Sequence, residues 1–329
     1  MQIVKKSVLI VMLLATVVGL SSWGFLVHHT TQQLAIYELP KAMQPFFFKA
    51  MKGLVKDATR PDERRNTDPT EATKHFIDLE AYGDSAAYKM PLNWDDAVAK
   101  YTKDTLLKYG YLPYHVIAMK ARLVDAFTAK DKDKILFIAA DLGHYLEDAN
   151  VPLHTSINYD GQMTNQKGIH ALWESVTPEV ELNSYTLSSK HKATYLAKPE
   201  KAIWNAIKIS NGLLAEMLLK EKEVSVNFPD SLKYKTVSKY GKKIKYYTEA
   251  FAKAYGESLK PSINQQLINS ANLVADFWFT AWVDAGKPDL DAILSIEEKK
   301  KWKIEKRSFR KNHLLQDGLL QAKTSYKPE

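Results

Sequence analysis

The chain has 329 residues, of which 45% are hydrophobic and 11% aromatic, so it can bury a large core and is not a mainly disordered protein. It contains no cysteine, which excludes disulfide bonds, lipid-modified cysteine and thiolate metal ligands. Its formal net charge of +8 predicts attraction to polyanions such as nucleic acid or anionic lipid headgroups.

The N-terminus has the pattern of a secretory signal peptide: two lysines, an apolar run over residues 7–20, and two serines. The apolar run is short for a membrane span. We therefore expect residues 1–22 to be a signal peptide and the protein to be exported, either to the periplasm or outside the cell. A retained membrane anchor is the alternative, because Leu20 is a poor residue at the third position before a cut after Ser22. Cleavage would remove two lysines and no acid, which lowers the formal charge from +8 to +6.

Beyond the signal segment, the sequence predicts helices. Apolar residues recur at helical spacing in residues 34–48, 115–129, 134–148, 203–219 and 263–285. No run alternates cleanly as a half-buried strand would. We therefore predict an all-α fold, with a single multi-helix domain over residues 23–298. The basic residues 299–329 would follow as a loosely packed last helix or a tail.

One short segment contains three histidines and two spaced carboxylates. Two pairs have a spacing of four residues: His144 with Asp148, and His170 with Glu174. On a helix this spacing puts both side chains of a pair on one face, so each pair can coordinate one cation. His154 lies between the pairs. Imidazole nitrogen and carboxylate oxygen are the usual non-thiol ligands of zinc, and such sites perform hydrolysis, so the segment predicts a catalytic metal site.

The alternative is coincidence, because a single histidine on a helix is more often packed or solvated than a ligand. The whole chain has nine histidines, however, and three of them lie in this window. That clustering, together with the spacing, favours the metal site.

Residues closer to the N-terminus extend the candidate set. Taken alone, Asp78 would be interpreted as a cap or surface residue, and His115 as a residue at the start of a helix. If the signal peptide is cut before Trp23, a free amine lies five residues from His28. A terminal amine and its own carbonyl can chelate a metal in a five-membered ring, and His28 would complete that site.

These residues, taken in order, resemble the ligand set of the zinc-dependent phospholipase C and S1/P1 nuclease superfamily, whose members are helical, exported and hold three zinc ions. The set comprises an N-terminal Trp, a His shortly after it, an Asp, a His, an HxxxD pair, a His, and an HxxxE or HxxxD pair. The matching residues are Trp23, His28, Asp78, His115, His144, Asp148, His154, His170 and Glu174. The likeness covers residues 23–174, and the remainder resembles the family only in being helical.

The resemblance implies three Zn²⁺ ions. The first would be held by Asp78, His115, His144 and Asp148; the second by His154, His170 and Glu174; the third by the amine and carbonyl of Trp23, His28 and the shared Asp148. Five neutral imidazoles and three carboxylates leave such a cluster positive, so it would form hydroxide and attract a phosphate diester. Two residues would be catalytic: Asp148 by bridging two ions, and Asp78 by orienting the attacking water or accepting its proton.

The choice of substrate depends on smaller features. Phospholipase C members end the set with HxxxE, as His170 and Glu174 do here, whereas nuclease members usually end it with HxxxD and carry a GGN stretch and disulfides. We therefore expect a phospholipase C-like phosphodiesterase that makes peripheral contact with membranes and has no obligate protein partner. An exported nuclease or nucleotidase acting on single-stranded nucleic acid is the first alternative, since the chain is basic. A non-catalytic metal-binding protein is the second.

Several nearby residues receive other interpretations. His29 would point away from His28, and His75 is expected to face solvent rather than support the metal site. Glu147 should face away from the cluster. Trp173 is assigned to the core, and residues 46–48, all phenylalanine, to packing first and lipid contact second.

Overall fold

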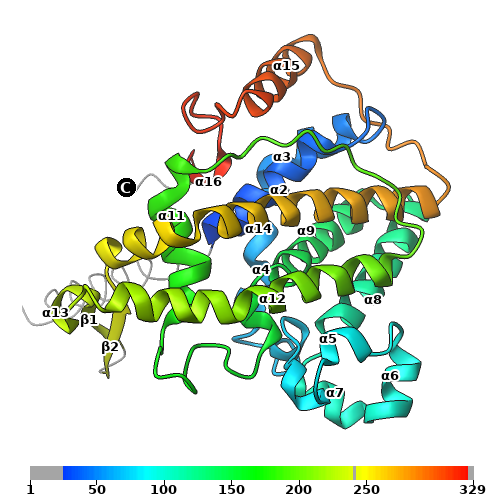
Figure 1. Cartoon of the computed structure of the whole chain (residues 1–329). Helices are drawn as coiled ribbons and strands as arrows, with labels where there is room; N and C mark the ends of the chain where they lie inside the picture. Colours follow the sequence, from blue (N-terminus) through cyan, green and yellow to red (C-terminus); the bar gives the residue numbers. More distant parts are fainter. Residues whose placement is uncertain (1–24, 240–241, 325–329) are drawn as a thin grey trace, which may run out of the picture.

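The computed structural model describes residues 25–239 and 242–324. It is mostly helical, which confirms the prediction of an all-α fold (Figure 1). The predicted signal peptide and Trp23 lie outside the described residues. Among the described residues, no helix is both long and apolar enough to cross a membrane.

The longer helices are α2 (Phe25–Glu38), α3 (Gln44–Lys56), α6 (Trp94–Tyr101), α8 (Leu112–Thr128), α9 (Lys132–Asp148), α12 (Pro199–Ser225), α14 (Glu249–Asp284) and α15 (Ile296–Arg310). The shorter ones are α4 (Arg60–Arg64), α5 (Ala86–Lys89), α7 (Lys103–Tyr109), α10 (Ile169–Ala171), α11 (Thr177–Glu181), α13 (Asp230–Lys233) and α16 (Gln321–Thr324). Five 3₁₀ turns are η1 (Asp57–Thr59), η2 (Ala72–Lys74), η3 (Leu79–Tyr82), η4 (Pro152–Thr155) and η6 (Leu182–Ser184). The segment η5 (Leu172–Val176) is a π-helical turn.

Helices α2 and α9 lie at the centre of the fold and approach each other closely. The Gln32 side-chain amide donates to the Ala140 carbonyl at 2.8 Å. Gly143 permits this approach, because a Cβ at that position would lie 2.5 Å from Gln32 Nε2. The contact brings the first turn of α2 beside the last turn of α9, so the rings of His28 and His144 stack with their centroids 4.2 Å apart.

The long helix α14 packs across this central pair and also against α8, α11 and α12 (Figure 1). Its N-terminus is capped by Thr248, whose hydroxyl accepts from the Phe251 backbone at 3.2 Å. The fully buried Trp278 donates its indole N–H to the Ala139 carbonyl at 3.0 Å. Its ring also stacks on Phe47 with centroids 5.0 Å apart. These contacts fix α9, and with it the residues at its C-terminal end.

The first predicted helix, residues 34–48, is divided in the structure. α2 ends at Glu38 and α3 begins at Gln44. Pro40 lies between them, and proline cannot donate the backbone hydrogen bond that a continuous helix needs. The phenylalanines at 46–48 are all buried, as the packing interpretation predicted.

The described residues also form one pair of strands, which the alternation pattern did not indicate. Strands β1 (Tyr234–Lys239) and β2 (Lys242–Tyr247) form an antiparallel hairpin in which Tyr234 pairs with Tyr247. The strands are rich in lysine and tyrosine instead of alternating apolar and polar residues, so the pattern of a half-buried strand is missing.

The C-terminal segment is packed onto the domain by α15. Ser295 and Glu298 form a reciprocal capping box at its start, so the boundary predicted at residue 298 falls inside this helix. Glu305 accepts a hydrogen bond from the Tyr37 hydroxyl at 2.9 Å, and buried Phe309 stacks on the Tyr37 ring at 5.1 Å. Residues 299–310 therefore belong to a packed helix, which the short helix α16 follows.

Candidate metal centre

The structure gathers histidine and carboxylate side chains from separate parts of the chain into buried clusters that could bind metal ions. Three groups have their nitrogen and oxygen atoms within 4.8 Å of one another: His28, His144 and Asp148; Asp62, His75 and His144; His154, His170 and Glu174. Six of the nine residues predicted as ligands thus come together: His28, His144, Asp148, His154, His170 and Glu174.

Asp148 lies at the centre of these groups. Its Oδ2 atom is 2.9 Å from His75 Nδ1 and 3.4 Å from His144 Nε2. Its Oδ1 atom is 3.8 Å from His154 Nε2 and 4.0 Å from His28 Nε2. His144 and Asp148 lie one turn apart on α9, as their spacing predicted. One carboxylate therefore faces all three groups, which is the arrangement of a bridging ligand.

The second pair lies where α10 passes into the π-helical turn, a type of turn frequent at functional sites. His170 Nε2 is 2.8 Å from Glu174 Oε2. The same oxygen lies 3.7 Å from His154 Nε2, which is held by the turn η4 that starts at Pro152. The other oxygen, Oε1, lies 3.5 Å from His28 Nε2. Glu174 therefore connects the second group with His28.

Backbone carbonyls fix the orientation of three of the rings. Their Nδ1 atoms lie 2.9 Å from Ala58 O for His144, 2.6 Å from His75 O for His154, and 2.8 Å from Tyr159 O for His170. A carbonyl only accepts, so each Nδ1 carries a proton and the Nε2 atom of each ring is the one directed to the cluster. These Nε2 atoms and the carboxylate oxygens converge on one region, so the groups could hold a metal ion.

The other two rings are backed by carboxylates. Glu147 forms a hydrogen bond with His28 Nδ1, and Glu71 Oε1 lies 3.5 Å from His75 Nε2. Glu71 is itself held by Arg64 at 3.0 Å and Lys74 at 2.6 Å. A carboxylate behind a histidine orients the ring and makes it a more basic ligand.

Burial and neighbouring charges shift the pKa values of the central residues, and the shifts of His144 and Asp148 favour the protonation states that metal ligands need. Burial, together with His28 and His75, lowers the pKa of His144 to about 4, so this ring is neutral at neutral pH. Burial alone would raise the pKa of Asp148, but His144, His154 and His75 hold it well below its usual range. Burial lowers the pKa of His75, but Asp148 and Glu71 outweigh this effect and raise it to about 9.

The structure does not bring Asp78 or His115 into any of the three groups. The His115 ring packs edge-on against Tyr145, with centroids 4.6 Å apart, and burial followed by Lys74 lowers its pKa to about 3. Burial and then Glu80 raise the pKa of Asp78 to about 6.

Asp62 and His75 stand in the group where Asp78 and His115 were expected. Asp62 Oδ1 lies 3.8 Å from both His75 Nδ1 and His144 Nε2. In this part of the ordered ligand set, the sequence required only an Asp followed by a His. Asp78 with His115 and Asp62 with His75 both meet that requirement. One further signal was present, because His75 follows Glu71 by four residues, the spacing of an outer carboxylate and its histidine.

Two of the other interpretations are corrected. His75 does not face solvent, since only 1% of it is exposed. Glu147 does not face away from the cluster, because it contacts His28 from the neighbouring face of α9. Trp173 is buried, as expected. Since Trp23 lies outside the described residues, its amine remains a prediction.

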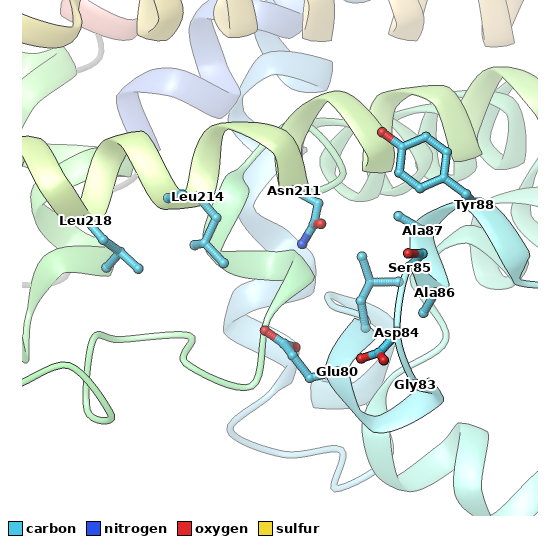
Figure 2. Close-up of a pocket in the computed structure, with 12 residues that line it drawn as sticks. Glu80, Gly83, Asp84, Ser85, Ala86, Ala87, Tyr88, Asn211, Leu214 and Leu218 are labelled. Atoms are coloured by element: carbon cyan, nitrogen blue, oxygen red, sulfur yellow. The ribbon is translucent and has the colours of Figure 1, made fainter.

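A pocket lies beside the segment that holds His154. Glu80, at the edge of this pocket, accepts hydrogen bonds from the Ser156 hydroxyl at 2.5 Å and the Ile157 backbone at 3.0 Å. The pocket has a volume of about 470 Å³ and lies between η3, α5 and α12. Figure 2 shows Leu214 and Leu218 of α12 on one side of it and the segment with Glu80 and Asp84 on the other.

No family model matches the chain, and neither does any curated protein.

Proposed function

We propose that the chain is an exported, zinc-dependent phosphodiesterase of the phospholipase C type that holds three zinc ions. The observation that carries this proposal is the position of Asp148, whose two oxygens lie within 4.0 Å of nitrogen atoms of His28, His75, His144 and His154, and these four histidines are distributed over all three groups. A cluster of cations would account for so many converging ligand atoms.

The three groups would divide the ions among them. Asp62, His75, His144 and Asp148 would hold the first; His154, His170 and Glu174 the second; His28, Asp148 and the predicted amine of Trp23 the third. Bound zinc would supply Lewis acidity and lower the pKa of a water molecule toward neutrality.

The chain's own residues would bind and orient the substrate phosphate. Asp62 is 35% exposed at its side chain and His170 is 26% exposed, so the cluster is open to solvent at these two residues. A phosphate diester would approach there. Asp62, in the role that the resemblance gave to Asp78, would orient the attacking water or accept its proton.

Two features support a lipid substrate. The second pair ends in glutamate, as in phospholipase C members, and the pocket beside His154 is lined partly by leucine and alanine, which suits the apolar part of a lipid. The second candidate is a nuclease for single-stranded nucleic acid, which is favoured by the five lysines and four tyrosines of residues 234–247.

The test compares release of the phosphorylated headgroup from phosphatidylcholine with release of nucleotides from single-stranded DNA. We expect lipid hydrolysis that is lost with a chelator and restored by zinc, and that is lost in Asp148→Asn. Asp125→Asn, an exposed aspartate on α8, is the matched control and should keep full activity. Hydrolysis of DNA alone would establish the nuclease, and zinc binding with neither activity would establish the binding protein.

A further inference from the structure

The hairpin β1–β2 carries an unusual concentration of positive charge. Residues 234–247 include five lysines and no acidic residue. Lys243 and Lys245 are exposed on β2. Asp230 lies 3.6 Å from Lys245 Nζ and opposes only part of this charge. The hairpin therefore presents a positive surface to solvent.

The hairpin is fixed to the loop that precedes His170 through buried Glu221 of α12. Glu221 Oε1 accepts from Tyr247 at 2.9 Å and pairs with Lys233 at 2.6 Å. Its Oε2 accepts from Gln166, four residues before His170, at 2.6 Å. This shared carboxylate holds the positive surface in a constant position relative to the metal centre.

A groove of about 900 Å³ separates the hairpin from that loop. Lys167 and Gly168 line one side of it, and residues 243–247 line the other. Gly168 is two residues before His170, and a Cβ there would lie 3.4 Å from the Tyr247 ring. The groove thus extends from the positive hairpin to the segment that carries the second metal pair.

Exposed aliphatic side chains accompany the lysines. Val226 is 84% exposed and Leu232 59%, both in the connection from α12 to the hairpin, and Ile244 on β2 is 36% exposed. Across the groove, Met163 in the loop before His170 is 67% exposed. Three tyrosines, Tyr234, Tyr246 and Tyr247, also line the groove, but Tyr247 is buried and the other two are half-buried, so none presents a fully exposed ring on which a base could stack. Lysines beside exposed aliphatic residues are typical of surfaces that contact anionic bilayers.

We propose that this docking face, formed by Lys167, Val226, Leu232, Lys243 and Lys245, binds the surface of an anionic lipid bilayer and so presents the metal centre to its substrate. The inference rests on the proposed phospholipase function, because it supplies that enzyme with a way to reach lipids that remain in a membrane. The lysines contact the anionic headgroups while the aliphatic side chains enter the interface.

Helix α15 is the alternative surface for binding to a bilayer, since it also exposes an aliphatic residue, Ile296, and several lysines. It lies apart from the hairpin, at the top of the view in Figure 1, whereas the hairpin lies at the lower left. It also contains Glu297, Glu298 and Glu305, which offset part of its charge. Lys299 and Lys300 of α15 therefore provide a matched control for Lys243 and Lys245.

The experiment is co-sedimentation of the purified protein with vesicles of phosphatidylcholine alone or mixed with phosphatidylserine. We expect binding to the mixed vesicles only. Lys243→Ala with Lys245→Ala should weaken it about fivefold per lysine and about twenty-fivefold in total. Lys299→Ala with Lys300→Ala should leave it unchanged. Hydrolysis of a soluble short-chain phosphatidylcholine, which requires no docking, should be equal in all three proteins.

Unchanged vesicle binding in the hairpin variant, or an equal loss in the α15 variant, would overturn the docking face. Loss of binding to single-stranded DNA with intact vesicle binding would assign the face to nucleic acid instead and would also overturn it. Failure of the proposed function gives a different result, in which the short-chain lipid is not hydrolysed by any of the proteins while the hairpin variant still loses vesicle binding.

Discussion

His75 and His115 offer the sharpest mutational test of the metal centre, because the structure and the ordered sequence match assign the same role to different residues. His75 Nδ1 lies 2.9 Å from Asp148 Oδ2, 3.1 Å from His144 Nε2 and 3.8 Å from Asp62 Oδ1. His75→Ala removes the atom that touches every other member of its group, so we expect one zinc ion per chain to be lost.

We expect His75→Ala to lower zinc binding and activity, and His115→Ala to lower the free energy of unfolding. Loss of an outer partner of a metal ligand lowers metal affinity by roughly 10–100-fold, so loss of His75 itself should lower activity by at least about 100-fold. His115→Ala removes edge-on ring contacts with Tyr145 at 4.6 Å and Tyr111 at 5.9 Å. At about 0.5–1.5 kcal/mol for each aromatic pair, it should cost about 1–3 kcal/mol of unfolding free energy and no zinc.

The assay is zinc content by elemental analysis, read together with urea unfolding of each variant. We expect His75→Ala to retain two zinc ions and His115→Ala to retain three with a lower unfolding midpoint. If His115→Ala loses zinc while His75→Ala keeps all of it, the assignment of the first site from the structure is refuted and that from the sequence order is restored.

Three further predictions follow from the contacts around α9. Asp148→Asn should lower zinc content and reduce hydrolysis by more than about 100-fold, since this carboxylate faces all three groups; full activity with full zinc would contradict the bridging role. Glu147→Gln weakens the partner of His28, and chelator competition should show about 10–100-fold weaker zinc binding, whereas unaltered affinity would reduce Glu147 to a packing residue. Gly143→Ala places a Cβ 2.5 Å from Gln32 Nε2, so urea unfolding should show a loss of about 1–3 kcal/mol, and an unchanged midpoint would mean that α2 and α9 separate without cost.

The sequence predicted the helical frame and the second half of the site because these depend on local spacing. His144 with Asp148, and His170 with Glu174, lie four residues apart on helical turns, so periodicity alone places each pair on one face. The π-helical turn at Glu174 was not predictable from that spacing, yet it keeps the pair in contact.

The first half of the site could not be chosen from the sequence because its residues meet through tertiary contacts. Asp62 and His75 lie in a region of short helices and turns, and apart from the four-residue spacing of Glu71 and His75 nothing in their neighbourhood distinguishes them from Asp78 and His115. Glu147 was misplaced for a related reason. α9 is buried on every side near its end, so a residue that points away from one partner meets another, here His28 on α2.

Elemental analysis of the purified, exported protein is the decisive measurement for the metal centre. We expect three zinc ions per chain, which a chelator removes and reconstitution restores. A protein that holds no transition metal, even after incubation with zinc, would contradict the metal centre and the phosphodiesterase activity derived from it.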